Sequence, residues 1–210
     1  MIKVKLIEAI VYSIWLVNMR NQLRIIGGQW RGRKLQFTSQ KDLRPTNDRL
    51  RETLFNWLQN DIDHAHCLDA FAGTGILGIE ALSRNARSVI FCERTRKTAH
   101  NLEHQLKTLP LTDYQSYQVL LGNALSHIAN MAQAFDIIFL DPPFNQSCKL
   151  LSQCLQIIEQ YSLLKPQGVI YLEMPSQVNL TDVAPPSLGS SHKQTNQGQV
   201  AAYLLRPLAN

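Results

Sequence analysis

The sequence lacks several features that whole classes of protein require. Its four cysteines form no CxxC pair, and three of them lie in strand-like or amphipathic segments, which favours buried free thiols in a reducing cytoplasm. His100 and His104 stand four residues apart, but no third ligand has suitable spacing, so we expect no metal site. The apolar run at the start is short for a membrane span and is interrupted by Glu8, so we expect no membrane association.

The start of the chain resembles a signal peptide only in part. Lys3 and Lys5 precede the apolar run, but no small-residue cleavage site follows it, and Met19 stands directly before a basic block. We therefore interpret residues 1–18 as a non-native or disordered extension, with Met19 as the natural start. The remaining length fits one domain with a small appendage.

Acidic residues are scarce between positions 20 and 51. Nine Lys or Arg residues in this stretch face only Asp42 and Asp48, so it carries +7, whereas the whole chain carries +5. A compact cationic block beside a slightly acidic remainder indicates binding to a phosphate backbone. A solvated basic tail is the alternative.

The apolar pattern predicts an α/β fold. Residues 23–37 contain two short β-type runs around a Gly-rich turn, which predicts a hairpin, and leucines at helical spacing predict a helix from about 48 to 59. From residue 65 onward, five apolar runs alternate with helical patterns, which predicts a parallel sheet with right-handed crossovers. A loop over 175–191 and a final hairpin containing "VAAYLL" are expected to close the chain.

The segment "LDAFAGTGILGIEAL" predicts a nucleoside-binding loop. Gly73, Gly75 and Gly78 satisfy GxGxxG between a strand and a helix, and Glu93 ends the next strand, where an acid can accept hydrogen bonds from a ribose. Nicotinamide dinucleotides and S-adenosylmethionine both fit this pattern. Asp69, just before the loop, favours S-adenosylmethionine, because a carboxylate attracts its ammonium and sulfonium groups but would lie close to a pyrophosphate.

The segment "FLDPPF" follows the fourth of these strands and predicts an amine-binding site. Asp141 should face the same crevice as Asp69 and Glu93, because ligands of open parallel sheets bind beyond the carboxyl ends of the strands. Asp141 and the carbonyl of Pro142 can accept the two N–H bonds of an exocyclic amine on a nucleobase. Pro142 and Pro143 make this turn rigid, and Phe144 can stack on the base.

Five segments together carry a resemblance to a known family. In order they are "RIIGGQWRGRKL", "LRPTNDRLRETLFNWL", "CLDAFAGTGILGIEALSR", "FLDPPF" and "GQVAAYLL". They resemble the RsmD family, bacterial 16S rRNA (guanine-N2)-methyltransferases, from about Arg24 to Pro207. The resemblance implies the Rossmann-like class I methyltransferase fold that depends on S-adenosylmethionine. This fold has a seven-stranded, mostly parallel sheet with a reversed last strand, here with an N-terminal β-hairpin.

The resemblance also implies a reaction and its partners. The expected reaction transfers a methyl group from S-adenosylmethionine to the N2 amine of one guanine in 16S rRNA, within the 30S ribosomal subunit. Residues 19–60 would form a basic RNA-binding hairpin and helix, and residues 61–210 would form the methyltransferase domain. We expect the protein to act as a monomer in the cytoplasm.

Site residues follow from the same resemblance by position. The expected catalytic residues are Asp141, Pro142, Pro143 and Phe144. The expected cofactor-binding residues are Asp69, Phe71, Ala72, Gly73, Thr74, Gly75, Glu93, Arg94, Asn123 and Ala124; Asn123 stands where many methyltransferases have Asp. The expected RNA-binding residues are Arg24, Trp30, Arg31, Arg33, Lys34, Arg44, Arg49 and Arg51, with Trp30 stacking on a base.

Four other functions remain alternatives. A DNA methyltransferase acting on adenine N6 or cytosine N4 would use the same DPPF turn, although the chain has no large target-recognition domain. A protein glutamine methyltransferase would favour NPPY in its place. A nicotinamide oxidoreductase would use the glycine loop, although Asp69 and DPPF argue against it. A binding protein that has lost catalysis is the last alternative, although the donor and acceptor residues all remain.

Overall fold

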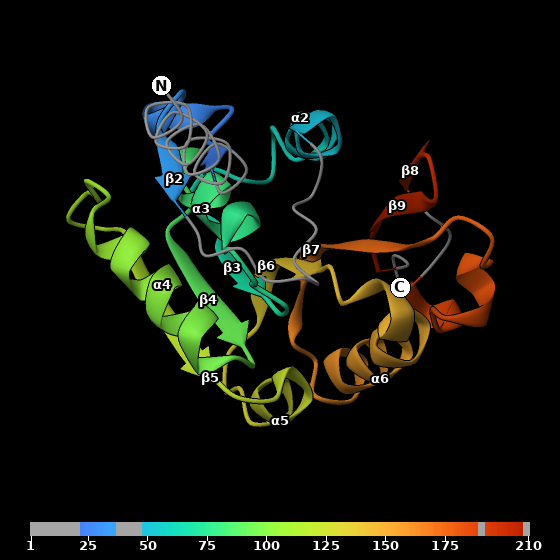
Figure 1. The fold of residues 1–210 in the computed structure, drawn as a ribbon. Coiled ribbons are helices and arrows are strands. Elements are labelled where there is room, and N and C mark those ends of the chain that lie inside the picture. Colours follow the sequence, from blue (N-terminus) through green and yellow to red (C-terminus); the bar gives the residue numbers. More distant parts are fainter. Residues whose placement is uncertain (1–21, 37–47, 189–191, 208–210) are drawn as a thin grey trace, which may run out of the picture.

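A seven-stranded sheet forms the centre of the computed structural model, which describes residues 22–36, 48–188 and 192–207 (Figure 1). Its strand order is β5–β4–β3–β6–β7–β9–β8. The strands are β3 (His66–Asp69), β4 (Ser88–Glu93), β5 (Ser116–Leu121), β6 (Phe135–Leu140), β7 (Leu164–Pro175), β8 (Lys193–Gln197) and β9 (Val200–Leu205). β3 to β7 are parallel, and β9 runs antiparallel to both β7 and β8. The predicted mostly parallel sheet with a reversed last strand is confirmed.

Helices cover both faces of this sheet. Four of them follow strands in the chain: α3 (Ile76–Ser83), α4 (Arg96–Lys107), α5 (Ala124–Ala129) and α6 (Ser147–Gln160). One hydrophobic core joins α3 and α4 to Phe91 and Phe139, and the other joins α5 and α6 to Ile138 and Leu140. The predicted loop over 175–191 contains two short 3-10 turns, Leu180–Asp182 and Pro186–Leu188.

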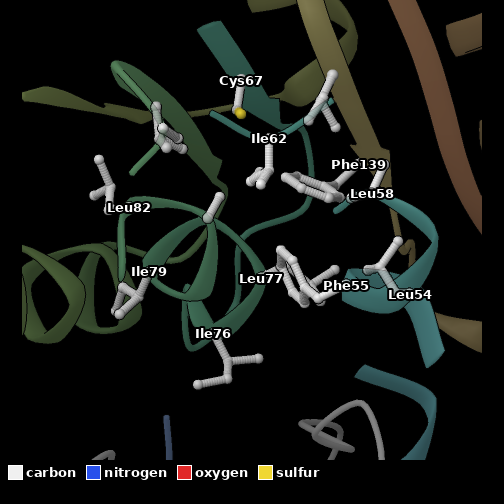
Figure 2. Packing of buried hydrophobic residues seen from close by; sticks show 14 of the residues in the cluster. Leu54, Phe55, Leu58, Ile62, Cys67, Ile76, Leu77, Ile79, Leu82 and Phe139 are labelled. Carbon is white, nitrogen blue, oxygen red and sulfur yellow. The ribbon is translucent and has the colours of Figure 1, made fainter. Parts of the chain in front are cut away.

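The N-terminal hairpin and its helix share the first of these cores. The hairpin consists of β1 (Gln22–Arg24) and β2 (Lys34–Gln36), with a 3-10 turn at Gly28–Trp30 between them. Helix α2 spans Asp48–Trp57, close to the predicted bounds. Its Phe55 lies beside Leu77 of α3 and near Phe139 of β6, with 6.1 Å between the two phenyl ring centroids (Figure 2). Leu23, Ile25 and Leu35 extend the same core into the hairpin.

Helix α3 holds the hairpin through two buried polar side chains. The Ser83 hydroxyl donates to the carbonyl of Gly27 at 2.7 Å and accepts from the Trp30 N–H at 3.0 Å. The Glu80 carboxylate accepts from the Ile26 N–H at 2.9 Å. Gly28 has a φ of +74°, and a Cβ there would lie 1.9 Å from the Ser83 carbonyl oxygen. Only glycine fits this close approach, so the hairpin is seated on α3 at a fixed position.

Candidate active site

Three acidic residues predicted to share a crevice lie at the carboxyl ends of neighbouring strands. Asp69 ends β3, Glu93 ends β4, and Asp141 directly follows β6. In the sheet register, Asp69 pairs with Phe91 and with Phe139, each two residues before another of these acids. β3, β4 and β6 are neighbours in the sheet, so the three acids lie at one edge.

The other two acids lie close enough to Asp69 to act on its pKa. Burial, chiefly, raises the pKa of Asp69 from 3.8 to about 7, against a hydrogen bond from the Gly78 N–H that lowers it. The negative charges of Asp141 and Glu93 raise this pKa further. A buried site that gathers like charges is costly unless a ligand supplies positive charge or hydrogen-bond donors. The chemistry of this edge therefore fits a cationic ligand.

The predicted cofactor loop wraps around two of these carboxylates. Asp69 Oδ2 accepts from the Gly78 N–H at 3.1 Å, inside the first turns of α3. Glu93 Oε2 accepts from the Gly73 N–H at 3.0 Å, and its Oε1 accepts from the Thr95 N–H at 2.6 Å. Gly75 has a φ of +74°, and a Cβ there would lie 2.3 Å from Leu102 Cδ1. This positive φ favours glycine at position 75.

The other predicted cofactor residues lie in this loop or just after β4 and β5. Phe71 and Thr74 are half-buried, Ala72 and Ala124 are buried, and Arg94 is exposed. Asn123 is exposed and caps α5, because its side-chain oxygen accepts from the Leu125 N–H at 3.0 Å. Their contacts with a cofactor remain predictions.

The DPPF turn presents a rigid edge followed by an aromatic ring. Asp141 is half-buried, Pro142 is buried and Pro143 is exposed. Phe144 is 44% exposed, which is unusual for a phenyl side chain. It begins a 3-10 turn, Phe144–Gln146, and the Ser147 hydroxyl donates to its carbonyl at 3.0 Å. An exposed ring at the edge that carries these acids can stack on a planar ligand.

Two buried residues of β7 escaped the sequence analysis. The Tyr171 hydroxyl donates to Glu173 Oε1 at 2.7 Å, and both side chains are buried. The segment "GVIYLEM" indicated only a strand. The sequence signal for Glu173 is that an acid interrupts the apolar strand next to the DPPF strand. Acidic residues are almost never fully buried unless they are paired.

Most of the predicted RNA-binding residues are exposed, and two are not. Arg24, Arg31, Arg33, Lys34 and Arg49 lie on the surface, and Arg44 lies outside the described residues. The Arg33 guanidinium donates to the carbonyl of Thr108 at 2.6 Å, which holds it near the end of α4.

The predictions for Arg51 and Trp30 are wrong. The Arg51 side chain is fully buried, and its guanidinium lies 2.6 Å from Asp48 Oδ1 and 3.5 Å from Glu80 Oε2. The Trp30 ring is 6% exposed and belongs to the hydrophobic core. Both residues are buried where the N-terminal segment attaches to α3, so neither can reach RNA.

The cysteines agree largely with the expectation of buried free thiols. Cys67, Cys92 and Cys154 are buried and Cys148 is half-buried, and all four are free. Burial is the main cause that raises the pKa of Cys92 and of Cys154 to about 12, which makes these thiols poor nucleophiles. Within the described ranges, no three His, Cys, Asp or Glu side chains are grouped to hold a metal ion. No helix in the described part of the chain has the length and apolar character needed to cross a membrane.

Comparisons with known proteins agree with this architecture. The family model described as conserved hypothetical protein 95 matches residues 23–206. Ribosomal RNA small subunit methyltransferase D of Escherichia coli (strain K12) is 43% identical over 183 residues, which is 87% of this chain and 89% of the relative. The protein of that name from Haemophilus influenzae is 42% identical over 158 residues, or 74% of this chain and 80% of the relative.

A solved structure supports the fold in the same way. The Escherichia coli protein yhhF has a TM-score of 0.77 to this structure and 41% sequence identity, over 90% of this chain and 99% of the other. The predicted methyltransferase fold is therefore confirmed. With its five sequence segments, its sheet order and these relatives, the chain belongs to the conserved hypothetical protein 95 family, the RsmD family of ribosomal RNA small subunit methyltransferases.

Proposed function

We propose that this protein transfers a methyl group from S-adenosylmethionine to the exocyclic N2 amine of a guanine in 16S rRNA of the small ribosomal subunit. The relatives named above act, by their names, on small-subunit ribosomal RNA. The observation that carries the proposal is the convergence of Asp69, Glu93 and Asp141 at one sheet edge, where Asp141 begins the DPPF turn. A ribosomal substrate implies a cytoplasmic reaction, and we propose a monomeric enzyme.

The cofactor end of the site fits S-adenosylmethionine. Asp69 would attract its ammonium group, and Glu93 would accept from its ribose. The negative charge that these residues concentrate suits a cation and disfavours the pyrophosphate of a dinucleotide. When bound, S-adenosylmethionine supplies a methyl group that is already activated by its attachment to a positively charged sulfur.

The substrate end would position a weak nucleophile. The lone pair of guanine N2 is delocalised into the ring, so the amine must be held with that lone pair aimed at the methyl carbon. Asp141 and the Pro142 carbonyl would accept its two N–H bonds, and Phe144 would stack on the base. During methyl transfer, the Asp141 carboxylate would stabilise the positive charge that develops on the amine. The extra proton then leaves to solvent.

The exposed cations of the N-terminal segment would hold the RNA. Arg24, Arg31 and Lys34 project from the hairpin, and Arg49 from the start of α2. Such side chains bind phosphates and position the strand without choosing a base. The target guanine would leave its stack to reach Asp141.

The test uses labelled S-adenosylmethionine with two substrates, small subunits that lack this modification and their deproteinised RNA. Mass spectrometry of the digested nucleosides then identifies the product. We expect N2-methylguanosine in the subunits, and an Asp141→Ala variant that binds the cofactor normally but transfers poorly. Methylated adenine or cytosine in duplex DNA, with no transfer to either RNA, would establish the DNA methyltransferase instead.

A further inference from the structure

Glu173 directly follows Leu172 of β7, which pairs with Leu140, the residue before Asp141. β6 and β7 pair in parallel from Ile137 to Leu140, and the last printed pair is Leu140 with Leu172. β6 ends at Leu140, while β7 continues to Pro175 and pairs there with β9. The next residues along the two strands are Asp141 and Glu173. Glu173 is thus at the point where β7 extends past the DPPF turn.

The Glu173 carboxylate is buried and held in place. Its side chain is 8% exposed, and its Oε1 accepts the Tyr171 hydroxyl at 2.7 Å. Side chains two residues apart on a strand share a face. Tyr171 and Phe139 pack edge to face, with ring centroids 6.4 Å apart, so Glu173 shares their side of the sheet. Burial raises the pKa of Tyr171, and the charges of Glu173 and Asp141 raise it further.

The position of Glu173 bears on which nucleobase can bind at Asp141. The amine-binding turn contacts only the exocyclic amine, which guanine, adenine and cytosine all possess. What differs is the ring nitrogen beside the amine. Guanine N1 carries a hydrogen and donates, whereas adenine N1 and cytosine N3 carry a lone pair and accept. A carboxylate has about four acceptor positions and no donor when ionised, so it attracts the first arrangement and repels the other two.

We propose that Glu173 accepts the N1–H of the target guanine and so selects guanine over adenine and cytosine at the Asp141 turn. The inference rests on the proposed function, since it needs guanine N2 as the target. Asp141 and the Pro142 carbonyl hold the amine, and Glu173 accepts a hydrogen bond from the neighbouring ring nitrogen. The Tyr171 hydroxyl orients Glu173. Burial strengthens this selection, because the ring-nitrogen lone pair of a wrong base facing Glu173 would stay away from water without a donor.

The test compares two bases in two enzymes. Small subunits are reconstituted with 16S rRNA that carries either guanine or 2-aminopurine at the methylated position. 2-Aminopurine keeps the same exocyclic amine but has a lone pair at N1, and its fluorescence reports whether it leaves its stack. The measured quantity is the ratio of kcat/KM for guanine to that for 2-aminopurine, in the wild type and in Glu173→Gln.

Glutamine has the shape of glutamate but can donate to the N1 lone pair. We expect Glu173→Gln to lower the ratio by about 10- to 100-fold, the range for one lost hydrogen bond to a charged group. The missing O6 of 2-aminopurine affects both enzymes equally and cancels. Glu159→Gln, an exposed position on α6, is the matched control and should leave the ratio unchanged.

The possible outcomes separate this inference from the proposed function. If the wild type methylates no guanine N2, the proposed function fails. If it does, but the ratio is equal in the wild type and Glu173→Gln, only the role of Glu173 is overturned. Should Glu173→Gln fail to fold, Tyr171→Phe replaces it and should lower the ratio in the same direction, with unchanged affinity for S-adenosylmethionine; an unchanged ratio there would equally overturn the inference.

Discussion

Replacing Glu80 should break the attachment of the N-terminal segment to the methyltransferase core. Its fully buried carboxylate accepts from the Ile26 N–H at 2.9 Å and from Arg84 Nε at 3.0 Å, and it lies 3.5 Å from Arg51 Nη1. Glu80→Leu keeps a similar volume but removes the charge. Among the described residues, the buried Arg51 guanidinium would then keep its contacts with Asp48 and the carbonyl of Arg24.

The structure allows the size of the effect to be estimated. Removing one partner of a buried ion pair costs about 3–5 kcal/mol, because the other charge stays buried. For a chain of this length, that loss lowers Tm by about 6–20 °C. Replacing both members, as in Glu80→Leu with Arg51→Met, removes the stranded charge. The double variant should then lose only about 1–3 kcal/mol, the cost of leaving the Ile26 N–H and Arg84 Nε without their acceptor.

Urea unfolding followed by tryptophan fluorescence measures these differences, because Trp30 is buried where the hairpin contacts α3. Glu159→Leu is the exposed control and should change stability by less than about 0.5 kcal/mol. The reasoning would be refuted if Glu80→Leu lost less than about 1 kcal/mol. It would also be refuted if the two single losses simply added in the double variant, because then the pair does not interact.

Three further predictions concern the hairpin and the cofactor loop. Gly28→Ala should cost clearly more stability than Gly32→Ala in thermal unfolding: both have positive φ, but only at Gly28 does a Cβ meet Ser83, so equal losses would contradict the close approach. The pKa of Asp69 is raised from 3.8 to about 7, so between these values the folded state keeps a proton that the unfolded state has released. Proton binding by Asp69 therefore stabilises the fold fully below about pH 4, and this contribution is lost as the pH rises through 7. Asp69→Asn should therefore gain Tm relative to the wild type at pH 8 but not at pH 4, while calorimetry should find S-adenosylmethionine affinity rising from pH 6 to 8 only in the wild type. Arg31→Ala with Lys34→Ala should lower the slope of log Kd for RNA against log salt by about 1.5, from about 0.7–0.9 per phosphate contact, and an unchanged slope would remove both residues from the RNA interface.

The sequence predicted the scaffold well because its signals are local. Alternating apolar runs identify parallel strands, and the acids that end them must meet at one edge of the sheet. Burial of a charged residue depends instead on a distant partner. Arg51 looked like one more cation of a basic block, since nothing nearby indicates that Glu80, on another helix, neutralises it. Trp30 was misjudged for the same reason, because the α3 surface that covers it lies some fifty residues further along the chain.

Glu173 could not be predicted as a site residue from the sequence, for a different reason. Its position matters only through the register of β6 against β7, which places it after Leu172 as Asp141 follows Leu140. A strand pattern in one sequence gives the faces of a strand but not the alignment with its neighbour. The role of Asp141 followed from its own segment, whereas the position of Glu173 required the sheet.

The place of β9 between β7 and β8 bears on how the protein is made. Synthesis proceeds from the N-terminus, so every helix and all five parallel strands leave the ribosome before residues 200–205 that form β9. Until then the outer edge of β7 offers unpaired backbone groups from Ile170 to Pro175, a stretch whose residues are all buried in the folded protein. Such an edge invites pairing with other chains. The insertion of β9 beside β7 is therefore a late event in the biogenesis of this protein, and shortened chains that end before residue 200 should accumulate as aggregates rather than as partly active enzyme.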